Sequence, residues 1–240
     1  MRYIHPIAPH EKFVASGTYK YSNGGDPTGL AEHFTIHEHP DGAWFMRVDK
    51  DGRFFDGRSE LIEVYRDPAG MIERYDIHAY GAKGDPLKKA RAIYTFEDGM
   101  LHVGREIDGG ERVQEQLELP EDYVVQPGSY LFFGYALPVL VERAPLAMVS
   151  RFGITEPVAD SFGAGVTNPQ VTFYGEDEVK VDGKLLPARK YMAAASVQMD
   201  SGRETVWHNY FIDEHDIFLR HDGGEMRVQL ERYAHRPEKT

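Results

Sequence analysis

Apolar and polar residues alternate along most of this chain in short runs, which are separated by clusters of turn-forming residues. The pattern is clearest between residues 189 and 233, where polar clusters rich in Asp, Glu, Ser and Gly break the runs at 200–202, 214–216 and 222–224. Alternation at period two is typical of β-strands, and short polar breaks between such runs are typical of hairpins. We therefore predict a β-meander over residues 189–233.

The same pattern predicts a long antiparallel meander in the first half of the chain, after a Pro- and His-rich arm of a dozen residues. Turn clusters containing Asp-Gly or Pro-Asp-Gly separate the runs, as hairpin connections require. The predicted strands cover residues 13–21, 30–39, 43–49, 59–66, 71–80, 90–96, 101–107 and 112–119, and they resume at 171–174, 178–181 and 184–186.

The middle of the chain departs from this alternation. Residues 125–150 form its most apolar stretch, and the Pro and Gly residues there prevent one long helix. We expect one or two short helices over about residues 129–142, packed across the sheet as a core plug or as the lid of a pocket. Residues 151–170, in which Gly and Pro are frequent, are expected to form a loop.

The predicted fold is mainly β. Its centre is a large curved antiparallel sheet, a β-roll or open barrel, with short helices from the 125–150 segment covering a cavity. A length of 240 residues is enough for a sizeable core, and all-β domains of this length are common. We expect residues 1–240 to form a single domain.

Net charge and amino-acid composition exclude several classes of binding partner and of chemistry. A net charge of −12 disfavours nucleic acid and acidic membrane surfaces, because both require a basic face. With no cysteine, the chain has no disulfide, thiolate metal site or cysteine nucleophile. Neither a secretory apolar segment nor a membrane-length apolar run occurs, so we expect a soluble, cytoplasmic protein without membrane insertion, although export followed by processing stays open. The sequence also leaves homodimer formation open.

The C-terminal half has an order of segments that resembles a known family. The strings VTFYGEDEVKVDGKLLPARKYMAA, RETVWHNYFIDEHDIFLRH and EMRVQLERY follow one another. They correspond to a strand pair with a small turn, a long strand, a Trp-containing strand with an acidic turn, and a closing strand. This order resembles the bacterial β-roll family related to the LolA/LolB lipoprotein carriers. The resemblance implies a curved antiparallel sheet around an apolar cavity.

Three histidines share one predicted strand face and suggest a metal site. His33, His37 and His39 follow period two, but residues two apart on one face lie about 7 Å apart, so a shared metal needs a ligand from another strand. The carboxylate that cupin-like sites place shortly after His-x-His is missing, because Ala43 and Trp44 stand there. We therefore expect no metal site, and we interpret His39 as a turn residue.

Ionisable and aromatic residues on the predicted strands are the candidates for chemistry. His208 and Tyr210 share a face with Val206 and Ile212, whereas a solvated face would favour Lys, Glu or Thr. Glu63 lies inside an apolar strand pattern, where burial can raise a carboxyl pKa, although a surface-facing Glu fits the same pattern. The catalytic candidates are His208, Tyr210, His78, Arg91 and Glu63, and the substrate-binding candidates are Tyr80, Tyr94, Tyr191, Trp207 and Arg189.

Two functions fit these candidates. Because no nucleophile elbow, phosphate loop or dinucleotide fingerprint occurs, the first is a cofactor-independent enzyme of lyase or isomerase type. It would act by acid/base catalysis on an apolar or aromatic small molecule in a β-lined cavity. The second is a non-catalytic carrier or sensor of a lipid-like or aromatic ligand. Ionisable groups that are buried and hydrogen-bonded to one another inside the cavity favour the enzyme, and a purely apolar lining favours the carrier.

Overall fold

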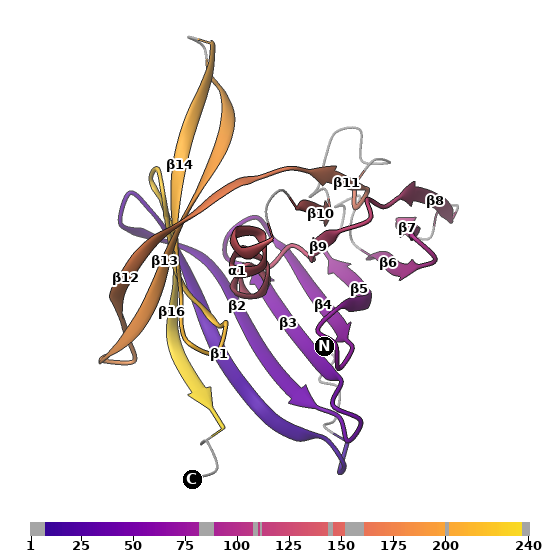
Figure 1. Cartoon of the computed structure of the whole chain (residues 1–240), viewed down its shortest axis with the longest axis horizontal. Helices are drawn as coiled ribbons and strands as arrows, with labels where there is room; N and C mark the ends of the chain where they lie inside the picture. Colours follow the sequence, from indigo (N-terminus) through magenta and orange to yellow (C-terminus); the bar gives the residue numbers. More distant parts are fainter. Residues whose placement is uncertain are drawn as a thin grey trace.

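The computed structural model describes residues 8–81, 89–107, 110, 112–143, 146–151, 161–199 and 202–236, with side chains not described at 195–199 and 202–204. Within these ranges the chain folds mainly as β-structure around one short α-helix (Figure 1). The predicted fold class is therefore confirmed. No helix in the described part of the chain is both long and apolar enough to cross a membrane.

The described residues form a large antiparallel sheet of thirteen strands, in the order β12-β13-β14-β15-β16-β1-β2-β3-β4-β5-β6-β7-β8. The sheet is open, because β12 and β8 form its two edges. The N-terminal half supplies β1 (Lys12–Asn23), β2 (Asp26–Glu38), β3 (Trp44–Gly52), β4 (Arg58–Arg66), β5 (Ile72–Tyr80), β6 (Lys89–Glu97), β7 (Met100–Ile107) and β8 (Val113–Glu118). The C-terminal half supplies β12 (Gln170–Val181), β13 (Lys184–Met199), β14 (Gly202–Ile212), β15 (Phe218–Gly223) and β16 (Met226–His235).

The two meanders join where the first strand pairs with the last. In the antiparallel pairing of β1 with β16, Tyr19 lies opposite Leu230 and Tyr21 lies opposite Val228. On the other side of β1, Gly17 lies opposite Phe34 of β2. This pairing makes the predicted C-terminal meander continuous with the N-terminal strands. It also creates one curved surface from segments far apart in the sequence.

A smaller three-stranded sheet and the helix fill the concave side of the large sheet (Figure 1). In the smaller sheet β10 (Ala147–Arg151) pairs in parallel with β9 (Tyr123–Gln126) and antiparallel with β11 (Ala164–Thr167). Between β9 and β10, the 3₁₀ turn η1 (Tyr130–Phe132) leads into α1 (Phe133–Glu142). The helical segment expected over about 129–142 is therefore confirmed. The strands of the smaller sheet are not predicted: β9 and β10 lie partly in the apolar stretch 125–150, where no alternation is visible, and β11 lies where a loop is expected.

Local capping and close packing fix the helical segment. The hydroxyl of Ser129 accepts a hydrogen bond from the backbone N–H of Leu131 and caps η1. At Gly134 a Cβ atom would lie 2.0 Å from the carbonyl oxygen of Asp216, so only glycine allows α1 this approach to the turn between β14 and β15. Arg189 holds that turn through the Asp216 carboxylate at 2.6 Å and the Asp213 carbonyl at 2.7 Å.

The remaining strand predictions differ from the structure mainly in length. The strands expected at 171–174 and 178–181 form one strand, β12, which contains a register shift between Phe173 and Gly175. The strand expected at 184–186 extends to Met199. Most of the N-terminal arm, residues 152–160 of the expected loop and most of the turns expected at 108–110 and 200–202 lie outside the described residues.

Candidate functional site

A pocket of about 390 Å³ lies between α1 and the face of the large sheet formed by β12 to β16. Most of its lining is apolar, and four of its side chains carry a hydroxyl or an imidazole. The lining residues are Tyr130, Phe133, Leu137, Leu140, Met148, Pro169, Val171, Ala193, Ala194, His208, Tyr210, His221, Gly223 and Met226. An apolar pocket with a few converging polar groups is the usual form of a small-molecule site.

Two histidines from neighbouring strands form the polar centre of this pocket. His208 on β14 is half-buried and His221 on β15 is buried. Nδ1 of His208 lies 2.9 Å from Nε2 of His221, and the ring planes are within 9° of parallel. The two imidazoles therefore share a hydrogen bond, and which nitrogen donates depends on their tautomers.

Two tyrosines flank the histidine pair. The hydroxyl of Tyr130 lies 3.3 Å from Nδ1 of His221, which extends the hydrogen-bonded chain to a third side chain. Tyr210 lies directly opposite His221 in the pairing of β14 with β15, with the ring centroids 4.9 Å apart. Phe133, the first residue of α1, packs on Tyr210 at 5.1 Å between centroids. The helix therefore fixes one wall of the pocket against the polar cluster.

The two imidazole rings occupy the space that a side chain at position 223 would fill. A Cβ atom at this position would lie 2.0 Å from Nδ1 of His208 and 2.6 Å from Nε2 of His221. Any larger residue would therefore separate the two rings or move a strand. The Asp-Gly-Gly turn between β15 and β16 thus has a second role beside its hairpin geometry.

Burial sets the protonation of the cluster. It lowers the pKa of His208, and together with the charge of His208 it lowers the pKa of His221 to about 4. Burial also raises the pKa of Tyr210 to about 12 and raises the pKa of Tyr130 well above its ordinary value. At neutral pH the pocket therefore holds two neutral imidazoles and two protonated phenols, each able to donate and to accept hydrogen bonds.

A buried carboxylate binds the residue that precedes Tyr130. Glu32 on β2 is fully buried and accepts hydrogen bonds from the hydroxyls of Tyr21 and Ser129, the latter at 2.7 Å. Lys50 adds an ion pair, with Nζ 3.4 Å from a Glu32 carboxylate oxygen. Since Ser129 directly precedes Tyr130, this network fixes the start of the segment that carries the Tyr130 hydroxyl.

The structure places two of the predicted catalytic residues, His208 and Tyr210, in the pocket. The predicted binding residue Tyr191 pairs with Tyr210 across β13 and β14 and is buried beside it. Trp207 alternates with His208 along β14 and is 47% exposed on the opposite face. Of the three candidates on β14, His208 and Tyr210 line the pocket and Trp207 does not.

Four further candidates lie on the outer face of the sheet. On β5, Tyr75, Ile77 and Ala79 are buried in the core, so the alternating His78 and Tyr80 point the other way. In the same region the carboxylate of Glu63 pairs with Arg47, and Arg91 donates to Asp76 at 3.2 Å. The structure does not bring His78, Tyr80, Glu63 or Arg91 to the pocket of His208, and ion pairs account for the two charged residues.

The last two candidates have packing roles. Tyr94 is buried in the core, where its ring stacks on Tyr75 at 4.1 Å between centroids and its hydroxyl donates to the carbonyl of Phe162. Arg189 holds the β14–β15 turn through Asp213 and Asp216. Neither belongs to the lining of the pocket that contains the histidine pair.

The three histidines of the expected strand face have separate surroundings. The ring of His33 lies 3.0 Å from the hydroxyl of Thr18, and that of His39 lies 3.0 Å from Asp41 in the turn after β2. His37 is buried and packs edge-on against Phe13. Among the described residues, no group of three or more His, Cys, Asp or Glu side chains is arranged to hold a metal ion.

Two residues of the site, His221 and Tyr130, are missed by the sequence analysis. His221 directly precedes the Asp222-Gly223-Gly224 turn, and the sequence analysis assigns it to no strand face. Tyr130 lies in the apolar segment expected to be helical. The available signal for His221 was alternation across β15, in which Phe218 and Leu219 are both buried and blur the pattern.

Comparison with known proteins supports the fold alone. A scan against protein families finds no match, and no curated protein sequence matches the chain. Among solved structures, the fold is similar to the crystal structure of a β-barrel-like protein of the domain of unknown function DUF1849 from Brucella abortus. That similarity has a TM-score of 0.53 with 14% sequence identity, and it covers 94% of this chain and 98% of that one.

Proposed function

We propose that this protein is a cofactor-independent enzyme of isomerase or lyase type that moves a proton on an apolar or aromatic small molecule. The observation that supports this most is the hydrogen-bonded chain from Tyr130 through His221 to His208, which opens on a mainly apolar pocket. Hydrogen-bonded ionisable groups in a pocket favour a catalytic role over that of a carrier, for which a purely apolar lining is enough.

The chain of three groups has two consistent hydrogen arrangements. In the first, His208 donates from Nδ1 to His221, His221 donates from Nδ1 to the Tyr130 oxygen, and Nε2 of His208 is a bare acceptor. In the second, the Tyr130 hydroxyl donates to His221, His221 donates to His208, and Nε2 of His208 carries the hydrogen. The first arrangement becomes the second when one proton enters at Nε2 of His208, one proton moves along each hydrogen bond, and the original hydroxyl proton leaves Tyr130, so the chain has the same net charge before and after.

This exchange matches the needs of a proton shift next to a carbonyl group. Starting from the first arrangement, Nε2 of His208 takes a proton from the carbon beside the carbonyl, and its electron pair forms the carbon–carbon double bond of an enol. The Tyr130 hydroxyl gives its proton to the carbonyl oxygen and receives a proton from Nδ1 of His221. His221 in turn receives, on Nε2, the proton from Nδ1 of His208. For a β,γ-unsaturated ketone the enol is a conjugated dienol, and return of a proton from His208 to its γ-carbon, with the enol proton going back to Tyr130, completes an isomerisation and restores the chain.

The Tyr210 hydroxyl has a different place in this scheme. Among the described residues no hydrogen bond to it occurs, and its ring forms part of the pocket wall beside His221. It is therefore placed to donate a second hydrogen bond to the substrate oxygen. A neutral substrate fits best, because the pocket lining carries no acidic or basic side chain other than the two neutral imidazoles.

Solvent deuterium exchange tests the proposal directly. The protein is incubated in D₂O with cyclohexanone, phenylacetone or 3-cyclohexen-1-one, and exchange beside the carbonyl is followed by proton NMR. We expect the wild type to exceed the His208→Ala variant by about 100-fold or more, because a general base contributes roughly that factor. His102→Ala removes an exposed histidine on β7 and serves as the matched control.

The second candidate function is a carrier of a lipid-like or aromatic ligand, in line with the resemblance of the C-terminal half to the LolA/LolB-related β-rolls. The apolar share of the pocket lining supports it. A carrier would bind the probes without exchanging their hydrogens. Binding of a probe by wild type and His208→Ala alike, with equal and slow exchange in both, would contradict the enzyme and favour the carrier.

A further inference from the structure

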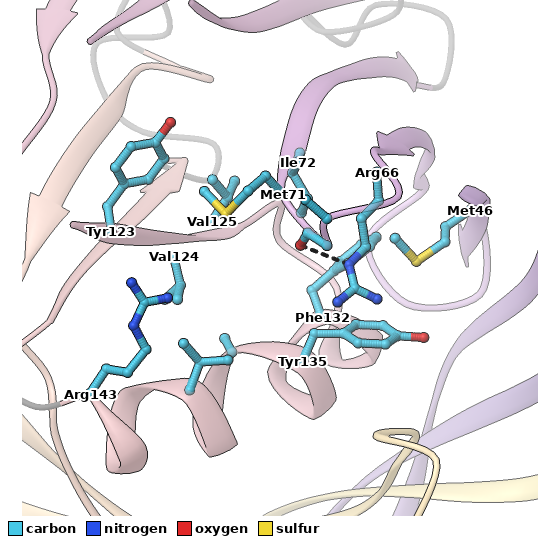
Figure 2. Close-up of a pocket in the computed structure, with 14 residues that line it drawn as sticks. Met46, Arg66, Met71, Ile72, Tyr123, Val124, Val125, Phe132, Tyr135 and Arg143 are labelled. Carbon is cyan, nitrogen blue, oxygen red and sulfur yellow. Dashed lines mark hydrogen bonds between the residues drawn. The ribbon is translucent and has the colours of Figure 1, made fainter. Parts of the chain in front are cut away.

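A second pocket, of about 160 Å³, lies against the opposite face of α1 (Figure 2). The pocket of the histidine pair uses Phe133, Leu137 and Leu140 of the helix, at helical spacing. The second pocket uses Tyr135, Ala136, Val139 and Arg143, together with Phe132 just before the helix. Its other walls are β9, the turn between β4 and β5, and Met46 of β3.

The lining of this pocket is apolar apart from two tyrosines and two arginines, and it contains no carboxylate. Figure 2 shows Arg66 and Arg143 at opposite ends, with Val124, Val125, Met71 and Ile72 along the side between them. In a chain with a net charge of −12, a lining with only positive charges is unusual. It favours an anion with an apolar body.

Arg66 and Arg143 differ in the groups that their guanidinium groups contact. Its Nε donates to the carbonyl of Gly70 at 2.8 Å, which fixes the guanidinium (Figure 2). The guanidinium lies over the rings of Tyr135 and Trp44, at 4.9 Å and 5.5 Å from their centroids. No ion pair with Arg66 occurs among the described residues, whereas Arg143 pairs with Asp122 at 3.1 Å on the surface. The terminal nitrogens of Arg66 are therefore fixed in orientation without a carboxylate partner.

The size of the pocket limits the ligand. A protein cavity of about 150 Å³ holds one benzene ring. The fixed fork of an arginine accommodates a carboxylate through two parallel hydrogen bonds. We propose that this pocket binds a small aromatic carboxylate of the benzoate class, with the carboxylate on the terminal nitrogens of Arg66 and the ring between Met71, Val125 and Ala136. The site is separate from the histidine pair and does not depend on the function proposed for it.

Calorimetric titration of the full chain with sodium benzoate at neutral pH tests the site. We expect one benzoate per chain in the wild type and binding weaker by about 10-fold or more in Arg66→Gln, because a hydrogen-bonded charge pair is lost. Benzamide, which has the same shape without the charge, is expected to bind at least about 10-fold more weakly than benzoate. Arg74→Gln, which changes an exposed arginine on β5, is the matched control and keeps wild-type affinity.

A second variant separates loss of the site from loss of the fold. Ala136→Leu keeps Arg66 and fills the pocket from the helix side, so it abolishes benzoate binding while the circular dichroism spectrum stays that of the wild type. Ala193→Leu fills the pocket of the histidine pair instead and leaves benzoate binding unchanged. Absence of binding at millimolar benzoate, equal binding of benzamide, or binding that survives Ala136→Leu but not Ala193→Leu would overturn the proposal.

Discussion

Nδ1 of His208 lies 2.9 Å from Nε2 of His221, and this contact joins β14 to β15 at the base of an apolar pocket. The strand register places Tyr210 directly opposite His221, so His208 reaches its partner diagonally, past Gly223. His221 is buried, whereas His208 is half-buried and presents its ring to the pocket.

Replacing Gly223 by alanine is expected to separate the histidines. The added methyl group would lie 2.0 Å from Nδ1 of His208, so a ring or a strand must move. Overpacking of this kind costs about 1–3 kcal/mol of unfolding free energy. Deuterium exchange should fall to the level of His208→Ala. Urea unfolding and ¹⁵N NMR of the imidazoles measure the two effects.

Gly104→Ala is the control for that substitution. Its Cβ atom would meet only the end of the flexible Arg112 side chain, at 3.1 Å, so we expect little change in stability or exchange. Imidazole ¹⁵N shifts in Gly223→Ala that match those of the wild type would show that the backbone relaxes and that the glycine is dispensable.

The stability of the protein should depend on pH through His221. In the unfolded chain His221 binds a proton near pH 6.5, whereas in the folded protein its pKa is about 4. Between these values the unfolded state binds more protons, so the free energy of unfolding falls as the pH is lowered through this window. The shift corresponds to about 3 kcal/mol between neutral pH and pH 4.

The variant His221→Gln isolates this contribution. Urea denaturation measures the unfolding free energy of both proteins at neutral pH and at pH 4. The decrease between these two pH values should be smaller in the variant than in the wild type, by about 3 kcal/mol. Burial also lowers the pKa of His37, His78, His208 and His235, and these remain in both proteins. Parallel pH curves for the two proteins would show that His221 titrates as in the unfolded chain.

Turn chemistry and alternation were sufficient to predict most of the large sheet. Asp-Gly and Asn-Gly-Gly clusters mark hairpins, as at Asp182-Gly183, where β12 ends and β13 begins. The strands of the smaller sheet were missed because β9 and β11 have four residues each, too few for a period to be visible. They form because they pair with each other through β10, which no local pattern reveals.

The candidate site was predictable on one strand only. Period two groups His208 with Tyr210, but it does not say which face of a sheet is concave, and Glu63 and His78 satisfy the same rule on the outer face. The partner of His208 depends on the register of β15, which includes a shift between Phe211 and Ile212. The contribution of Tyr130 depends on how α1 docks against the β14–β15 turn. Both are properties of tertiary packing rather than of sequence periodicity.

Glu60→Gln is expected to destabilise the attachment of the smaller sheet. Arg151 of β10 reaches Glu60 of β4 at 2.6 Å, and the two side chains are only 5% and 12% exposed. Removing one partner of a buried ion pair leaves the other uncompensated and costs about 3–5 kcal/mol. The matched change Glu97→Gln removes a carboxylate that is 63% exposed and should cost less than about 1 kcal/mol. Equal urea midpoints for the two variants would contradict a stabilising role of the buried pair.

Tyr130→Phe distinguishes a relay from a lone base. The ring is retained and keeps its contacts with Phe218 and Tyr21, at 5.2 Å and 5.8 Å between centroids, so we expect the unfolding free energy to stay within about 1 kcal/mol of the wild type. The lost hydroxyl removes the group that lies 3.3 Å from Nδ1 of His221.

If protons pass along the whole chain, deuterium exchange in Tyr130→Phe falls about 100-fold, as for His208→Ala. The ¹⁵N shifts of His221 then change toward a single tautomer, because only His208 still fixes its hydrogen. Tyr174→Phe, which alters a tyrosine that is 65% exposed, should change neither quantity. Full exchange in Tyr130→Phe with loss in His208→Ala would mean that His208 acts as a base without His221 and Tyr130, and that the hydrogen-bonded chain only positions its ring.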